Sequence, residues 1–217
     1  MQPDPSRKYL TIVSHYEARL AEHGDTFRGV DYPRATDPAL CYQVMLELIK
    51  SHESPVTLLD FGCGASHLYE YILTHQISGI EYSGLDLSTK FLELSKQKFP
   101  AVQYYQADLL NDSVELPQFD YVVMAGVFTE KLSLSYEEML AYFQALVKRV
   151  FQQARIGIAF NVMSKHVDWE REDLLHLPLD TAAAFVVKHL SRYFVVRQDY
   201  GLYQYTMYVY KQPGIQP

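Results

Sequence analysis

The chain has 217 residues, of which 48% are hydrophobic and 21% are charged, so it can bury a substantial core and is not a disordered tail. Its formal net charge of −7 and its scattered basic residues argue against a nucleic-acid partner, because clustered lysines and arginines hold phosphate backbones. The 2 cysteines form no disulfide framework and no apolar run approaches the ~20 residues of a membrane span, so we expect a cytoplasmic protein without a membrane partner.

The first fifty residues are expected to form a mainly helical lead-in, ahead of a sheet domain at residues 51–217. Apolar side chains recur at helical spacing in residues 9–20 and again in residues 40–49. Residues 24–38, which connect the two patterns, contain glycine and proline and therefore favour a loop.

A glycine-rich turn follows the first predicted strand, residues 56–61. The motif DFGCGAS runs from Asp60 to Ser66, and a helix is predicted over residues 66–74. A buried strand that passes through two glycines into a helix places backbone N–H groups where a polar ligand can approach closely. The sequence therefore predicts a ligand-binding loop at Gly62 and Gly64.

Apolar runs and helical periods alternate beyond this loop, and that alternation predicts a parallel sheet covered by helices. Ser88 is a suitable cap for the helix after the second strand, and Pro100 is expected to stop that helix. The further strands are predicted at residues 79–87, 102–106, 119–125 and 155–161, and the further helices at 90–99, 135–151 and 181–190.

The end of the chain breaks the alternation. Residues 193–200 and 203–211 are both β-rich, and only Gly201 and Leu202 separate them. So short a gap permits a hairpin and excludes a parallel crossover. The predicted fold is therefore a doubly wound, mostly parallel seven-stranded sheet with a reversed antiparallel final strand and helices on both faces. Its end carries tyrosines that suggest a sheet surface or a homodimer contact: Tyr200, Tyr203, Tyr205, Tyr208 and Tyr210.

The spacing of Asp60, Gly62 and Gly64, together with the reversed end of the sheet, resembles the class I S-adenosylmethionine-dependent methyltransferases. Ser66 stands where the motif of that family has its third glycine. A dinucleotide motif, G-x-G-x-x-G, would instead need a glycine at His67. The resemblance covers about residues 58–211 and implies a Rossmann-like fold and S-adenosylmethionine as the cofactor.

The resemblance also implies how the strand ends contact the cofactor. Asp86 would accept hydrogen bonds from both ribose hydroxyls, although a helix-capping or solvated aspartate is the alternative. Asp108 would contact the adenine amino group, unless it is a turn aspartate. Asp60 would order the loop and receive the cofactor ammonium directly or through water. The predicted cofactor-binding residues are Asp60, Gly62, Cys63, Gly64, Asp86, Leu87, Asp108, Leu109 and Ala125.

The methyl-acceptor side is less defined by the sequence. His166 is a candidate general base because imidazole titrates near neutrality, although a lone loop histidine is more often solvated. Asn161 ends the fifth predicted strand, while Tyr16 and Asp31 could reach the cofactor or substrate if the lead-in closes over the site as a lid. Methyl transfer from an activated sulfonium needs mainly an aligned nucleophile, so a base is not obligatory. The histidines and cysteines show no metal-ligand spacing, and we expect no metal.

The favoured function is methyl transfer from S-adenosylmethionine to a small molecule, since the chain is acidic, compact and without a separate recognition domain. One alternative is a catalytically silent, methyltransferase-like partner protein, which Ser66 and the absence of an obvious base would allow. A nicotinamide-dependent oxidoreductase is the other alternative, and His67 and the reversed tail both disfavour it. The oligomeric state stays open.

Overall fold

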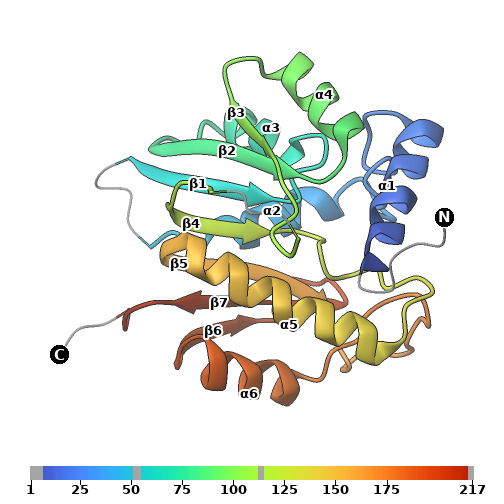
Figure 1. Ribbon diagram of the computed structural model, residues 1–217, viewed down its shortest axis with the longest axis vertical. Helices are drawn as coiled ribbons and strands as arrows, with labels where there is room; N and C mark the ends of the chain where they lie inside the picture. The colour runs from blue at the N-terminus through green and yellow to red at the C-terminus, as the bar shows by residue number, and fades with distance from the viewer. Residues whose placement is uncertain (1–6, 51–54, 112–114, 215–217) are drawn as a thin grey trace.

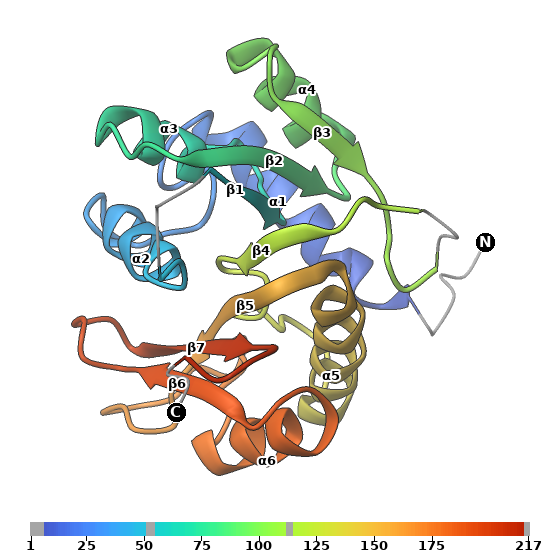
Figure 2. The ribbon, with the colours of Figure 1, turned by 90° about the vertical axis from the view of Figure 1, so that its left-hand side faces the viewer.

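A seven-stranded sheet forms the centre of the computed structural model, which describes residues 7–50, 55–111 and 115–214 (Figures 1 and 2). The strand order is β3-β2-β1-β4-β5-β7-β6, and the first five strands of the chain run parallel. This topology confirms the predicted fold class. The strands are β1 (Val56–Phe61), β2 (Ile80–Asp86), β3 (Gln103–Gln106), β4 (Phe119–Met124), β5 (Ala154–Met163), β6 (Tyr193–Arg197) and β7 (Gln204–Tyr210).

Helices cover both faces of the sheet, with α2 and α3 on one side and α5 on the other (Figure 2). Successive side chains of a strand point to opposite faces, so Leu58 packs with the α2 and α3 side while Leu59 packs with α5 and α6. Both leucines are fully buried. The helices are α1 (Leu10–His23), α2 (Asp37–Leu46), α3 (His67–Thr74), α4 (Thr89–Lys98), α5 (Tyr136–Gln153) and α6 (Leu179–His189).

The predicted start of α4 is confirmed by its cap. The Ser88 hydroxyl accepts a hydrogen bond from the Phe91 backbone N–H, and α4 ends before Pro100. A capping box starts α5, in which Ser135 and Glu138 each bind the backbone of the other. Among the described residues, no helix has the length and the apolar character needed to cross a membrane.

The last strand of the chain lies inside the sheet. β7 pairs antiparallel with β5 on one side and with β6 on the other, so all its residues are buried. The suggestion that the terminal tyrosines form an exposed surface is therefore wrong for all but Tyr203, which is 54% exposed. Two of the buried hydroxyls, from Tyr208 and Tyr210, donate hydrogen bonds to the Val44 and Leu48 carbonyls in and just after α2. These tyrosines therefore tie the lead-in to the far end of the sheet.

Candidate functional site

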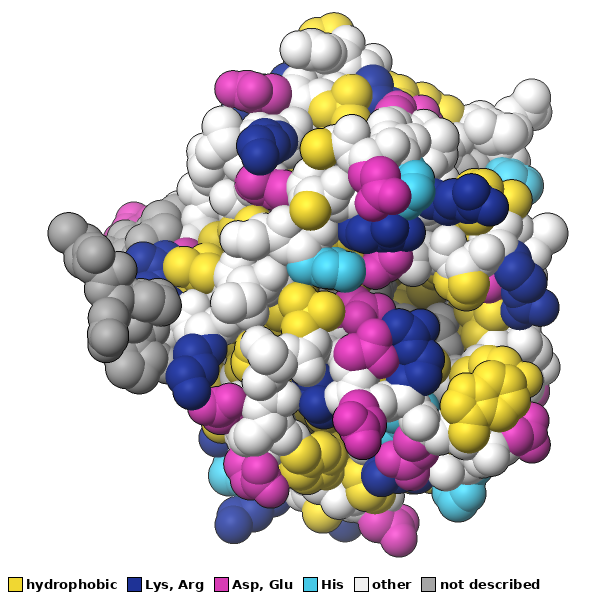
Figure 3. Space-filling view, turned by 90° about the vertical axis from the view of Figure 1, so that its right-hand side faces the viewer, with side chains coloured by type: hydrophobic (Ala, Val, Ile, Leu, Met, Phe, Trp, Pro, Cys, Tyr) yellow, Lys and Arg dark blue, Asp and Glu magenta, His cyan; other side chains and the backbone are white. Residues whose placement is uncertain are grey.

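A cavity of about 570 Å³ opens at the carboxyl ends of the strands, within the size range of small-molecule sites. Helix α1 lies across this edge of the sheet, toward which β1 and β4 point (Figure 1). On the same side of the molecule, acidic and basic side chains surround a hollow (Figure 3). The cavity wall includes the predicted residues Asp60, Gly62, Cys63, Gly64, Asp86, Leu87 and Ala125.

The glycine loop between β1 and α3 needs left-handed backbone at three positions. Gly62 has φ +75°, and a Cβ atom there would lie 2.8 Å from the Val127 side chain. Gly64 has φ +50°. Ser66, in place of the third glycine of the motif, also adopts this conformation, with φ +58°. A serine can hold this strained geometry here because its buried hydroxyl hydrogen bonds to Ser95 Oγ at 2.9 Å and to the Tyr104 hydroxyl at 3.0 Å.

The backbone N–H groups of the glycine loop are directed at β2. Those of Gly62 and Cys63 donate to the Leu85 carbonyl at 2.7 and 3.0 Å, and that of Gly64 donates to Asp86 Oδ2 at 2.9 Å. These three N–H groups are therefore not left free for a ligand. They fix the loop to the end of β2 instead, which holds the two glycines at the cavity wall.

Asp86 connects the loop to the start of α4. Its Oδ1 accepts a hydrogen bond from the Ser88 N–H at 2.8 Å, while Oδ2 accepts the Gly64 N–H. A carboxylate has about four lone-pair positions, so each oxygen can accept one further bond from a ligand in the cavity. The side chain can thus hold the Ser88 backbone at the start of α4 and bind hydroxyl groups at the same time.

Asp60 is a buried carboxylate at the end of β1, with only 3% of its surface exposed. The Tyr82 hydroxyl donates a hydrogen bond to its Oδ2 at 2.8 Å. Burial raises the pKa of Asp60 to about 7, because the desolvated carboxylate is costly, and the nearby charge of Asp86 adds to the increase. A cation bound beside Asp60 would restore its ionised form.

Asp108 and Leu109, the remaining predicted cofactor contacts, are not among the described residues that line the cavity. Asp108 contacts the residues that precede α1. Its Oδ2 accepts hydrogen bonds from the Tyr9 hydroxyl at 2.6 Å and from Arg7 Nη2 at 2.7 Å. No local sequence pattern indicates these partners, since they lie 99 and 101 residues away from Asp108. In this structure Asp108 anchors the start of α1.

We expect Tyr9→Phe to lower the free energy of unfolding by about 1.5–3 kcal/mol, because it removes a hydrogen bond to a buried charged group. Urea denaturation measures this change. Tyr142→Phe is the matched control, since Tyr142 stacks on Tyr9 and no described residue hydrogen bonds to its hydroxyl. Equal destabilisation in both variants would show that the Tyr9–Asp108 bond contributes nothing.

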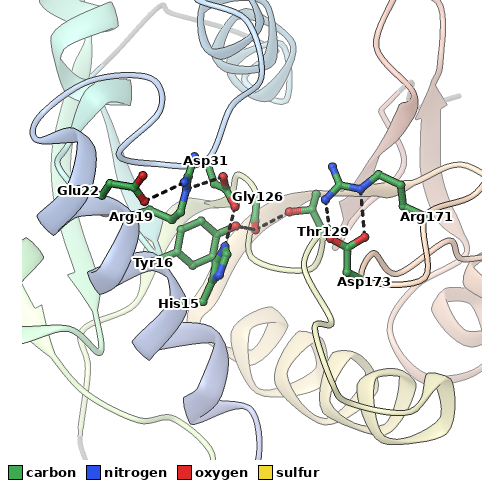
Figure 4. Close-up of polar contacts among 9 residues, drawn as sticks. All are labelled: His15, Tyr16, Arg19, Glu22, Asp31, Gly126, Thr129, Arg171 and Asp173. Carbon is green, nitrogen blue, oxygen red and sulfur yellow. Dashed lines mark hydrogen bonds and ion pairs between the residues drawn. The ribbon is translucent and has the colours of Figure 1, made fainter.

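The structure brings two of the three catalytic candidates to the cavity wall, namely Tyr16 and Asn161. The Tyr16 hydroxyl donates to the Gly126 carbonyl at 3.3 Å (Figure 4), and burial raises its pKa, so it stays protonated near neutrality. Asn161 Oδ1 accepts the Gly126 N–H at 2.8 Å, and its Nδ2 donates to Gln204. His166 is exposed and is not among the described residues of the cavity wall.

A cluster of charged side chains has no counterpart in the sequence motifs, and two of its members, Asp31 and Glu130, line the cavity. His15 Nε2 lies 2.6 Å from Asp31 Oδ2, and Arg19 Nε donates to Asp31 Oδ1 at 2.9 Å (Figure 4). Ligand atoms of His15, Asp31 and Glu130 all lie within 4.8 Å of one another, a distance compatible with a metal ion. Sequence spacing cannot reveal such a cluster, because the fold joins residues far apart in the chain. The expectation of no metal therefore stays a prediction.

A family model described as "Methyltransferase domain" matches residues 59–153, the segment from β1 through α5 that holds the glycine loop, Asp86 and Gly126. This segment is a methyltransferase domain, and the fold around it is that of the class I S-adenosylmethionine-dependent methyltransferases. This methyltransferase is also 27% identical, over 161 residues, to Rv1506c of Mycobacterium tuberculosis, a protein named for an inferred methyltransferase activity. That match covers 72% of this chain and 94% of the relative.

Solved structures share the fold of the methyltransferase over almost its whole length. The magnesium protoporphyrin IX methyltransferase of Synechocystis PCC 6803, with bound S-adenosylmethionine, aligns with a TM-score of 0.66 and 14% identity, covering 96% of this chain and 100% of that one. The 1,6-didemethyltoxoflavin-N1-methyltransferase of Burkholderia thailandensis aligns with a TM-score of 0.64 and 15% identity. The alignment covers 98% of this chain and 92% of that one. These likenesses establish the fold.

Proposed function

We propose that the protein transfers the methyl group of S-adenosylmethionine to a small molecule. The observation that carries this proposal is the hydrogen bond from the Gly64 N–H to Asp86, which joins the glycine loop to the second acid beside a cavity. S-adenosylmethionine supplies a methyl group already activated on a sulfonium. The protein then has to bind this cofactor, align the methyl acceptor and exclude water.

The residues present fit that cofactor. The open lone-pair positions of Asp86 suit the two ribose hydroxyls, and the buried Asp60 suits an ammonium group. Gly62, Cys63, Leu87 and Ala125 would complete the contacts along the cavity wall. Asp108 and Leu109 would contribute to cofactor binding indirectly, since Asp108 binds Arg7 and Tyr9 in the segment that leads into α1.

A small methyl acceptor is supported by the size of the cavity, whose wall includes Ile12, Val13 and Tyr16 of α1. The structure of the Burkholderia methyltransferase contains bound 1,6-didemethyltoxoflavin, a small molecule, and S-adenosylhomocysteine. We extend the same substrate class to this chain. No nucleic-acid partner is proposed, because the net charge is −7.

Tritium transfer from methyl-labelled S-adenosylmethionine into a metabolite extract tests the proposal. Labelled small-molecule products are expected with the wild type and not with a variant that cannot bind the cofactor. Calorimetric titration with S-adenosylhomocysteine is run in parallel. Cofactor binding without any transfer would favour the catalytically silent partner protein instead.

The lead-in at residues 1–50 is proposed to close the site as a lid on the domain at residues 51–217. Tyr9, Ile12, Val13 and Tyr16 of its described part line the cavity, and the Tyr9–Asp108 hydrogen bond attaches it to the sheet domain. The proposed boundary adjoins residues 51–54, which lie outside the described residues.

Affinity for S-adenosylhomocysteine is expected to rise as the pH increases through about 7. The ammonium of the ligand pairs with ionised Asp60, whereas the raised pKa leaves this group largely protonated at pH 6. Calorimetry at pH 6 and pH 8 measures the difference. Asp60→Asn removes the titrating group and should flatten the profile, so an unchanged profile in this variant would assign the pH dependence to another residue.

A further inference from the structure

Glu130 stands out among the carboxyl groups of the cavity. Glu130 follows the Gly126 turn after β4 and lines the cavity. Only 8% of its surface is exposed. Among the described residues, nothing hydrogen bonds or forms an ion pair with its carboxylate. Buried carboxylates normally have such a partner, because an unpaired one loses its hydration without compensation.

The other carboxylates of the cavity wall that have little exposed surface are already satisfied. Asp60 accepts from Tyr82, Asp86 accepts two backbone N–H groups, and Asp37 pairs with Arg34 Nε at 3.0 Å. Asp31 is bound by His15 and Arg19. Among the described carboxylates of the wall with little exposed surface, Glu130 is therefore the one that has no protein partner and that the proposed cofactor contacts do not use.

The basic side chains around the methyl-acceptor end have partners of their own. Arg34 pairs with Asp37, and Arg171 pairs with Asp173, whose Oδ1 accepts from Arg171 Nε at 3.0 Å (Figure 4). His176 is also engaged at both ring nitrogens, since Nε2 accepts the Arg171 N–H and Nδ1 lies 2.7 Å from the Ser164 carbonyl. An anionic methyl acceptor would meet arginines that are already paired, whereas a cation would meet an unpaired acid.

We propose that the methyl acceptor carries a protonated amino group, which Glu130 binds at the end of the cavity next to Tyr16. The inference rests on the proposed function, because it names the substrate class of the same site. Burial, together with the charge of Asp31, raises the pKa of Glu130 to about 7, and a bound cation would offset that cost. Asp31, whose carboxylate oxygen lies within 4.8 Å of a Glu130 oxygen, would add its negative charge to the same part of the cavity.

The cavity also offers an apolar surface for the remainder of such a molecule. Tyr32, Trp169 and Tyr203 line it, and the rings of Trp169 and Tyr203 lie 5.9 Å apart. Aromatic faces attract cations as well as apolar groups. An aromatic amine therefore matches both the acid and the rings, which makes benzylammonium a suitable probe.

Calorimetry on the whole chain, saturated with S-adenosylhomocysteine, tests the inference with three probes of similar shape: benzylammonium, benzyl alcohol and benzoate. The wild type should bind benzylammonium about tenfold or more tightly than benzyl alcohol. Glu130→Gln should remove this preference while leaving S-adenosylhomocysteine binding intact. Glu172→Gln is the matched control, since it makes the same change at an exposed position outside the cavity wall, and it should keep the preference.

Three results would overturn the inference: no preference of the wild type for benzylammonium, a preference for benzoate, or a preference that survives in Glu130→Gln. Titration with MnCl₂ alone adds a fourth, since Mn²⁺ binding that is lost in Glu130→Gln would assign the His15, Asp31 and Glu130 cluster to a metal. The wild-type comparison decides the matter even if Glu130→Gln does not fold. Failure of the wild type to bind S-adenosylhomocysteine would instead refute the proposed function itself.

Discussion

Gly64→Val is expected to weaken the binding of S-adenosylhomocysteine by about a hundredfold or more, which corresponds to ~2.7 kcal/mol. Gly64 has φ +50°, a conformation that costs a β-branched residue of order 1–3 kcal/mol. The valine side chain would also occupy space at the cavity wall, where we place the ligand. Isothermal titration calorimetry measures the affinity, and far-UV circular dichroism should remain nearly native.

Gly79→Val is the matched control for this substitution. Gly79 has φ +77° and precedes β2, at the opposite end of that strand from the cavity. It should therefore introduce comparable backbone strain and leave the affinity unchanged. An unaltered affinity in Gly64→Val, or an equal loss in both variants, would remove the glycine loop from the binding site.

Asp86→Ala is expected to weaken the binding of S-adenosylhomocysteine by at least about tenfold, or ~1.4 kcal/mol. The variant loses the group proposed to accept both ribose hydroxyls, and hydrogen bonds to charged groups contribute about 1.5–3 kcal/mol each. It also loses the bond that fixes the Gly64 N–H, so part of the effect should come from a loosened loop.

The 2′,3′-dideoxy analogue of S-adenosylhomocysteine separates these two contributions. Its affinity should fall less in Asp86→Ala than that of the parent ligand, because it never had the hydroxyl bonds to lose. Glu81→Ala, an exposed acid on the same strand, should change neither affinity. If the affinities of both ligands fall equally in Asp86→Ala, the residue serves only to hold the loop and contacts no ribose.

The glycine loop and the sheet could be predicted because their signals are local. The strand–turn–helix pattern around Gly62 lies within residues 56–74, and the two-residue gap at Gly201 and Leu202 excludes a crossover by its length alone. Ser66 departs from the motif but keeps its geometry, and the buried partners that allow this, Ser95 and Tyr104, lie 29 and 38 residues away.

The part of the cavity that we propose for the methyl acceptor could not be predicted. It is assembled from the lead-in and from separate loops. Glu130 shows nothing unusual in the sequence, and its burial without a partner emerges only when Asp31 and the segment between β5 and α6 lie against it. His166 has the chemical type of a general base but is exposed. The residue type alone does not predict whether a loop side chain points into the cavity or into solvent. The contacts of Asp108 could not be predicted either, because Arg7 and Tyr9, which bind it, lie near the start of the chain.

The placement of β7 between β5 and β6 has a consequence for the order in which the molecule folds. Its tyrosines Tyr208 and Tyr210 bind the carbonyls of Val44 and Leu48, at separations of 164 and 162 residues. Contacts this distant close large loops and form late. During synthesis, β1 to β4 can therefore pair before β7 exists, but the two hydrogen bonds from β7 to the Val44 and Leu48 carbonyls must wait for residues 204–210. Until those residues emerge from the ribosome, the nascent chain carries a half-sheet with β5 as an open edge, a state that chaperones would have reason to shield.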